Sequence, residues 1–113
     1  MNLAGKSVIL TVIVGESDTI HGKSFYEEIV KKARELNIAG ATVTRGIMGY
    51  GGTSRIHTIK VLRLSEDLPV TISIVDREEN IAKLIPFIEE NMKDGIVYST
   101  PCDVTIYRYH EGK

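Results

Sequence analysis

The chain has 113 residues, of which 42% are hydrophobic and 26% charged, the composition of one globular domain and not of a disordered or fibrous chain. Lys and Arg total 14 against 15 Asp and Glu, so the surplus of basic side chains that non-specific nucleic-acid binding requires is missing. The single cysteine, Cys102, excludes an internal disulfide and a zinc site built from cysteines alone. We therefore expect one domain over residues 1–113 with no nucleic-acid partner.

The first half of the chain predicts a strand, a loop and a helix. Residues 7–14 are rich in Val and Ile on both faces, as in a central strand, and residues 15–23 form a polar loop. Ser24, followed three residues later by Glu27, predicts a capping box at the start of a helix that ends near Asn37. The apolar stripe of this helix is Phe25, Ile29, Ala33 and Leu36.

The middle of the chain predicts two further strands around a glycine-rich segment. Residues 40–48 are rich in β-branched side chains and predict the second strand, whereas residues 46–52 hold too many glycines for regular structure. Residues 55–64 alternate weakly and fit either a short edge strand or an excursion of the chain. Residues 69–75 are the clearest strand, with Val70, Ile72 and Ile74 on one face and Thr71, Ser73 and Val75 on the other.

The last third predicts a second helix and a final strand. Asp76 and Glu79 fit a capping box, and the helix that follows ends at Gly95. Pro86 lies inside the helical pattern and predicts a kink or an irregular turn. The apolar stripe is Ile81, Leu84, Ile85, Ile88 and Met92, and residues 102–109 are expected to form the last strand.

The order of these elements predicts an α+β fold. Two β-α-β units joined by the glycine-rich connection form a ferredoxin-like βαββαβ sandwich, an antiparallel sheet with both helices on one face. The other face would carry a mixture of polar and apolar side chains such as Thr71, Ser73 and Val75. Because a half-apolar sheet surface needs a cover, we expect an oligomer.

Two segments could carry chemistry. Glycines in residues 46–52 let backbone N–H groups approach an anion, with Arg45 and His57 as a basic rim, although spacing alone favours a flexible hairpin with a bulge. In residues 15–23, Glu16, Asp18 and His21 are candidate metal ligands and Lys23 could meet a phosphate at the helix N-terminus. The alternative for this segment is a solvated loop whose side chains satisfy its own backbone.

Catalysis, RNA binding and membrane insertion are not expected. Spacing identifies no pair of nucleophile and base, so we expect no enzyme. The strands over residues 7–14 and 69–75 hold none of the aromatic side chains on which RNA-binding modules stack bases. The longest apolar run is too short for a membrane span, and the N-terminal residues lack a signal-peptide pattern, so we expect a cytoplasmic protein.

Three motifs resemble PII nitrogen-regulatory signalling proteins across residues 6–109. They are Asn-Ile-Ala-Gly-Ala-Thr-Val-Thr at residues 37–44, Gly-Tyr-Gly at 49–51 and Leu-Pro-Val-Thr-Ile-Ser-Ile-Val at 68–75. A closer resemblance is to an uncharacterised PII-like family that pairs Gly-Glu-x-Asp at 15–18 and His-Gly-Lys at 21–23 with residues 40–47 and 56–58. Members of that family are often encoded beside, or fused to, a fluoride-export channel.

The resemblance implies a non-catalytic homotrimer that binds an adenine nucleotide (ADP, ATP or AMP) in clefts between its subunits. By motif, the loop root of each cleft would be formed by Thr42, Gly49, Tyr50 and Gly51. Lys93 and Gly95 correspond approximately to a second phosphate loop, and Arg108 to a basic position of the last strand. The protein would signal through its glycine-rich loop to a partner such as a membrane transport protein or channel. The alternative is a metal- or ion-homeostasis trimer that uses Glu16, Asp18 and His21.

Overall fold

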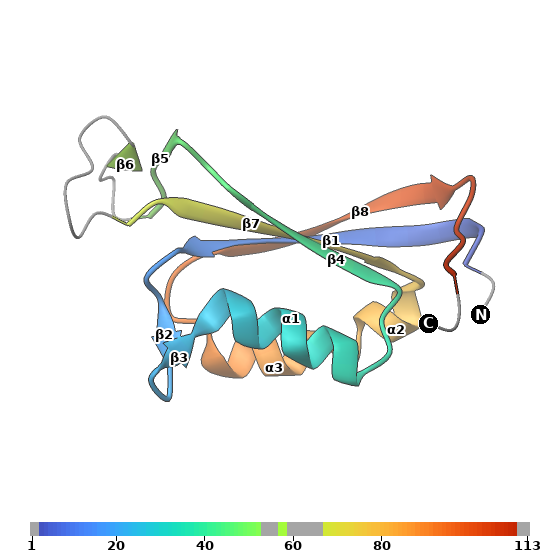
Figure 1. Cartoon of the computed structure of the whole chain (residues 1–113), viewed down its shortest axis with the longest axis horizontal. Helices are drawn as coiled ribbons and strands as arrows, with labels where there is room; N and C mark the ends of the chain where they lie inside the picture. The colour runs from blue at the N-terminus through green and yellow to red at the C-terminus, as the bar shows by residue number, and fades with distance from the viewer. Residues whose placement is uncertain (1–2, 53–56, 59–66, 111–113) are drawn as a thin grey trace.

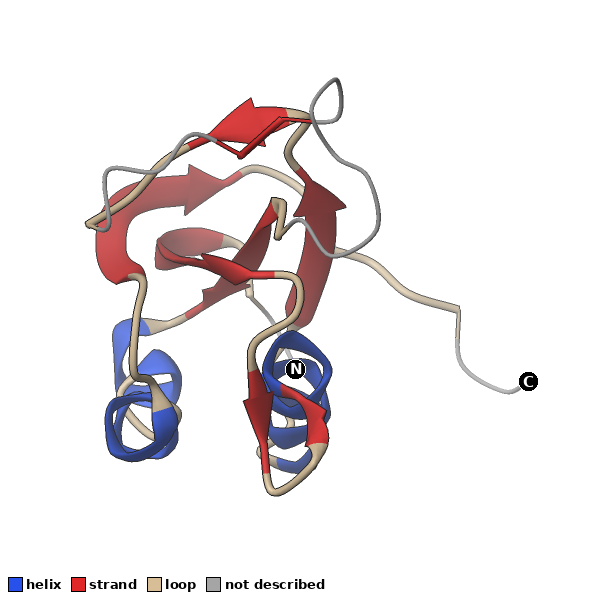
Figure 2. Cartoon of the chain, turned by 90° about the vertical axis from the view of Figure 1, so that its left-hand side faces the viewer, coloured by secondary structure: helices blue, strands red, loops and turns tan. Residues whose placement is uncertain are grey.

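The computed structural model describes residues 3–52, 57–58 and 67–110, which form a sheet lying over a layer of helices (Figure 1). The main sheet has four strands, β1 (Gly5–Gly15), β4 (Gly40–Arg45), β7 (Pro69–Asp76) and β8 (Ile96–Val104), in the order β4-β7-β1-β8. Every neighbouring pair is antiparallel. All helices lie on one face of the sheet (Figure 2). The predicted ferredoxin-like α+β fold is therefore confirmed.

Two short hairpins accompany the sheet. β2 (Thr19–Ile20) pairs with β3 (Lys23–Ser24) inside the segment predicted as a polar loop, and β5 (Met48–Gly49) pairs with β6 (His57–Thr58). The second strand therefore ends at Arg45, and the chain re-forms a short strand at Met48. Of the edge strand or excursion expected over residues 55–64, all but residues 57–58 lie outside the described residues.

The core lies between the sheet and the helices. Val70, Ile72 and Ile74 of β7 are buried together, as their alternation predicts. They meet Leu10, Val12 and Val14 of β1, and Phe25, Ile29 and Ala33 of α1 (Phe25–Glu35). The other face of β1 is only half-buried in the single chain, so the apolar character of β1 on both faces leaves one apolar face uncovered.

The start of α1 does not use the predicted capping box. Ser24 is the N-cap residue, but within the described structure its hydroxyl makes no capping hydrogen bond. Instead, the Phe25 N–H donates to the Asp18 carbonyl at 2.8 Å. A backbone carbonyl next to the β2–β3 hairpin thus satisfies an N–H group in the first turn of α1, the role predicted for the Ser24 and Glu27 side chains.

The second helix is two short helices, α2 (Glu78–Ile81) and α3 (Ile85–Asn91). Pro86 lies in the first turn of α3, where its missing N–H costs no helical hydrogen bond. The prediction of an irregular turn is therefore confirmed. No helix in the described segments is long and apolar enough to cross a membrane.

Asp76 does not act as the predicted N-cap. It is the buried last residue of β7, and α2 begins one residue later than expected, after Arg77. Its carboxylate accepts hydrogen bonds from the N–H groups of Ala39 and Arg77, at 2.9 and 2.6 Å, and from the Asn80 side chain at 3.0 Å. Asp76 thereby joins the end of β7 to the connection before β4.

The predicted bounds of the last strand were wrong. β8 runs over Ile96–Val104, not over residues 102–109. Pro101 lies within it, because β8 is at the edge of this sheet, where a residue without an N–H is tolerated. Residues 105–110 leave the sheet and cross its end, where the Tyr107 hydroxyl donates to the Ala39 carbonyl at 3.0 Å.

Candidate functional site

Several loops meet at one end of the sheet, where β1 ends and β7 begins (Figure 1). The segment after β1 is tied to the start of β7 by the Glu16 N–H, which donates to the Leu68 carbonyl at 2.8 Å. The exit of β4 is tied to the same place by the Gly46 N–H, which donates to the Pro69 carbonyl at 2.7 Å. The glycine-rich segment that follows β4 therefore starts beside the β1–β2 loop.

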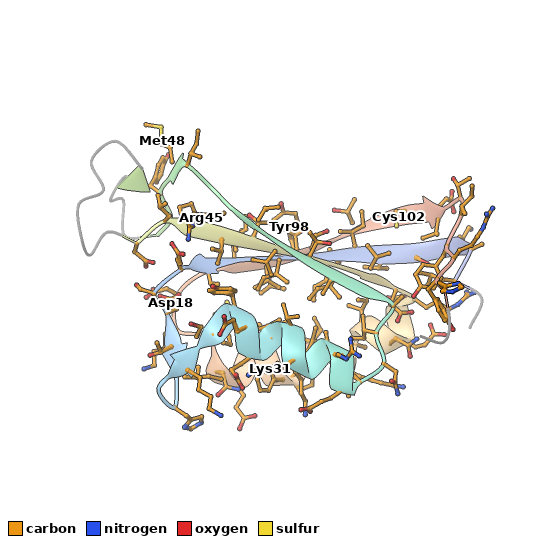
Figure 3. The ribbon with its side chains drawn as sticks, in the orientation of Figure 1. Asp18, Lys31, Arg45, Met48, Tyr98 and Cys102 are labelled. Carbon is orange, nitrogen blue, oxygen red and sulfur yellow. The ribbon has the colours of Figure 1, made fainter. Side chains whose placement is uncertain are left out.

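Charged side chains reinforce these backbone links. The Arg45 guanidinium forms an ion pair with the Glu16 carboxylate, joining the end of β4 to the β1–β2 loop (Figure 3 labels Arg45). The Ser17 N–H donates to the Asp67 carboxylate at 2.7 Å. One short loop thus holds both the outgoing end of the segment between β4 and β7, at Arg45, and its returning end, at Asp67.

Asp18 lies at the centre of an acidic group. Its carboxylate accepts the Gly15 N–H at 3.0 Å. Burial raises the pKa of Asp18 above 3.8, the nearby charges of Asp67 and Asp94 raise it further, and the hydrogen bond from Gly15 opposes them. These carboxylates make the side of the site nearest β1 and β8 unfavourable for an anion.

Two glycines are closely packed at this end, Gly95 against backbone and Gly15 against a side chain. Gly95 has φ +136°, and a Cβ there would lie 2.6 Å from the Ile13 carbonyl oxygen. A Cβ at Gly15 would lie 2.1 Å from an Asp67 carboxylate oxygen. At Gly51, by contrast, a Cβ would meet no described atom within 4 Å, so packing against the described residues does not explain that glycine.

The glycine-rich segment also displays apolar side chains. Tyr50 is 72% exposed, Ile47 70% and Met48 62%, three of the four highest values among the large hydrophobic residues described. Met48 projects outward beyond the sheet in Figure 3. These three residues, called the β5 knob below, form a surface without a cover in the described chain.

The structure brings together only part of the predicted site. Glu16, Asp18, Arg45 and Gly49 lie around the convergent loops, and Gly95 lies at the same end, at the start of β8. Tyr50 and Gly51 follow Gly49 directly, and Lys93 is exposed just before Gly95. His57 pairs with Gly49 in the β5–β6 hairpin.

Other predicted residues lie elsewhere. Thr42 is within β4, opposite Ser73, and Arg108 is in the exposed tail beyond β8, at the other end of the sheet. His21, with φ 51°, forms the turn between β2 and β3, and Lys23 is exposed in that hairpin. Glu16 is engaged by Arg45 and Asp18 by Gly15, so the expected set of Glu16, Asp18 and His21 does not converge. No group of three or more metal-binding side chains is found among the described residues.

Sequence reasoning missed three contributors. Asp67, predicted only as part of a turn, binds the β1–β2 loop, and Pro69 packs against Gly46 and Gly49. Asp94 contributes charge around Asp18. No local pattern predicts these contacts of Asp67 and Pro69, since their partners lie about twenty to fifty residues away in the chain.

Comparison with known proteins agrees with this architecture. Residues 7–104 match the DUF190 family, described as "Uncharacterized ACR". A UPF0166 protein of Methanocaldococcus jannaschii is 39% identical over 100 residues, which cover 88% of this chain and 92% of that protein.

Solved structures show the same fold. CPII, a nitrogen regulatory PII-like protein from Thiomonas intermedia K12 bound to ADP, AMP and bicarbonate, has a TM-score of 0.65 at 18% identity, covering 89% of this chain and 90% of that one. The GlnK–ATP complex of B. subtilis has a TM-score of 0.55 at 9% identity, covering 89% and 85%. The chain is thus a member of the DUF190 family with the fold of PII-like proteins.

Proposed function

We propose that this protein is a non-catalytic PII-like regulator. It binds an adenine nucleotide (ADP, ATP or AMP) in clefts between the subunits of a homotrimer and signals through its glycine-rich segment to a partner. The observation that carries the proposal is the convergence, at one end of the sheet, of the glycine-rich segment, the β1–β2 loop and the start of β8. A ligand held there would contact the root of the segment that signals.

The charges at this end favour one orientation of the nucleotide. Phosphate groups are stabilised by backbone N–H groups in glycine-rich turns and by cationic side chains. The acidic group around Asp18 repels them, whereas Gly49 and Gly51 lie on the side of β4, beside Arg45 and its partner Glu16. We expect the phosphates near this second group, and Gly51, which packing against the described residues does not require, to allow their close approach.

The uncovered sheet face supports the homotrimer. Ile9, Thr11 and Ile13 of β1 are half-buried in the single chain, as are Thr71, Ser73 and Val75 of β7. The start of β8 adds exposed Ile96 and Tyr98 to this face, since they pair with Ile13 and Thr11. Subunits that turn these faces toward a common axis would bury them.

The partner that we propose is a membrane transport protein or channel, with the regulator on its cytoplasmic side. The family resemblance to proteins encoded beside fluoride-export channels is the basis of this choice. The β5 knob adjoins the signalling segment, so a nucleotide at the root would act directly on that surface. Two relatives in fold were solved with adenine nucleotides, CPII with ADP and AMP and GlnK with ATP, which supports the choice of ligand.

A thermal-shift assay with a glycine variant tests the nucleotide site. ADP, ATP and AMP are added to the wild type and to Gly51→Val, with Ala82→Val, an exposed position between α2 and α3, as the control. A nucleotide at 100 times its dissociation constant stabilises the folded state by about 2.7 kcal/mol. We expect this stabilisation in the wild type and control and its loss in Gly51→Val. No shift in the wild type with any of the three nucleotides would contradict the proposal.

A further inference from the structure

The two edges of the sheet carry unequal apolar surfaces at the same end. β4 and β8 are the outer strands of the four-stranded sheet, so each has an edge without a partner in the described chain. Beyond the end of β4 lies the β5 knob of Ile47, Met48 and Tyr50. At the start of β8, Ile96 is 53% and Tyr98 47% exposed. Large apolar side chains that gather exposed at a sheet edge are typical of an interaction surface.

The β8 edge has a groove where the β4 edge has a projection. The groove has a volume of about 450 Å³ and lies between α3 and the start of β8. Its apolar lining comes from Ile85, Ile88 and Met92 on the helical side and from Val97 on the strand, and Glu89 supplies its charge. A groove of this size accommodates one or two large side chains.

Strand register places the knob and the groove at the same level along the strand direction. Arg45 at the end of β4 pairs with Val70, Val70 pairs with Val14, and the neighbouring Ile13 pairs with Ile96 at the start of β8. The three antiparallel pairings also make β4 and β8 run in opposite directions. Figure 1 shows the end of β4 and the start of β8 at the same end of the molecule. A rotation about an axis parallel to the strands therefore brings β4 of one copy antiparallel to β8 of the next.

We propose that the β5 knob of one copy inserts into the α3–β8 groove of the next copy, forming a head-to-tail interface. This inference rests on the proposed homotrimer and names the surfaces that build it. A head-to-tail contact repeated by rotation closes a ring. Arg45, which pairs with Glu16 in its own chain, directly precedes the knob and would approach Glu89 of the groove.

The same contact would complete the nucleotide cleft. Gly49 and Gly51 adjoin the β4 edge, whereas Lys93 and Gly95 precede the start of β8, and two strands separate β4 from β8 in the same chain. Insertion of the knob brings Gly49 and Gly51 of one copy beside Lys93 and Gly95 of the next, and the phosphates would lie on the side of Gly49 and Gly51, away from Asp94. The exposed tail, with Ile106, lies at the other end of the sheet, so it is the poorer candidate for the groove.

Disulfide cross-linking tests the contact. Cys102 is first replaced by Ser, and Ile47→Cys is combined with Ser99→Cys, both at exposed positions. Oxidation should give covalent dimers and trimers from the double variant, with at most dimers from each single variant. The matched control combines Ile106→Cys with Ser99→Cys and should give no ladder. A ladder from the control but not from the Ile47 pair would identify the tail as the occupant and overturn the proposal.

Molar mass by light scattering gives an independent measure. Met48→Asp should shift the assembled protein toward monomer at least tenfold in dissociation constant, whereas Ile106→Asp, at an equally exposed apolar position, should leave it unchanged. An assembled wild type that Met48→Asp does not weaken would overturn the knob-and-groove contact while leaving nucleotide binding intact. A wild type that binds ADP as a monomer would overturn both the contact and the trimer.

Discussion

At Asp18, the structure links a loop carboxylate to the pH dependence of folding. Its folded-state pKa lies above 3.8 because burial, Asp67 and Asp94 disfavour the charged form. The folded state therefore binds more protons than the unfolded state from about pH 4 up to the raised pKa, so stability falls as pH rises through that window. Ionised Asp18 lowers the stability at neutral pH and protonated Asp18 does not.

Asp18→Asn should remove this cost while keeping an acceptor for the Gly15 N–H. We expect a higher melting temperature than the wild type at pH 7 and a difference that shrinks as pH falls below the raised pKa. Thermal melts between pH 4 and pH 7 measure both. A variant that melts lower than the wild type at pH 7 would show that the negative charge of Asp18 is itself stabilising.

Gly95 is the residue for which glycine is most strictly required. Its φ of +136° strains any side chain, and its Cβ would lie 2.6 Å from the Ile13 carbonyl oxygen. We expect Gly95→Ala to lower the free energy of unfolding by at least about 2 kcal/mol. Gly51→Ala is the control, with no described atom within 4 Å and an expected change below about 1 kcal/mol. Urea denaturation measures both, and equal effects would contradict this account.

At the scale of elements, Asp76 joins three segments with one buried carboxylate. Its oxygens accept hydrogen bonds from Ala39, Arg77 and Asn80. Asp76→Ala leaves those donors without their acceptor, and we expect it to cost about 2–4 kcal/mol of unfolding free energy. Asp76→Asn keeps one acceptor oxygen and should cost less. Chemical denaturation compares the stabilities of the wild type, the asparagine variant and the alanine variant. An alanine variant as stable as the wild type would contradict the role of Asp76.

The sequence predicts an element well when neighbouring residues determine it, and poorly when residues distant in the chain determine it. The alternation in β7 and the stripe of α1 predicted both elements because side-chain period alone determines them. β8 was misplaced: Pro101 lies within it, and a proline is tolerated there because β8 is at an edge, a position that only the tertiary structure determines. Asp76 likewise has the sequence pattern of a cap, but its acceptor role involves Ala39, 37 residues away.

The candidate site was predicted less completely than the fold for the same reason. Glu16, Asp18 and Arg45 were named as loop candidates, but not the ion pair between Glu16 and Arg45 across 29 residues. Asp67 has no motif and was missed. Arg108 was placed on the last strand because the strand itself was misplaced, and it lies in the tail.

For the whole molecule, the open sheet face should be the surface that assembly buries. Ser73 is at the middle of this face on β7, paired with both Thr11 and Thr42. Ser73→Lys would place one charge from each subunit near a common axis and should dissociate the assembly into monomers. Thr19→Lys, an exposed change on β2, is the control. Sedimentation velocity measures the assembly state of both variants. An intact assembly in Ser73→Lys would contradict burial of this face.

The central claim is that the chain assembles into trimers with an adenine nucleotide between subunits. Native mass spectrometry with saturating ADP tests both parts at once, because it counts chains and bound nucleotides in the same particle. The account predicts a trimer carrying up to three ADP molecules, one for each cleft. A monomer at all concentrations, or a trimer that carries no nucleotide at saturation with ADP, ATP or AMP, would contradict it.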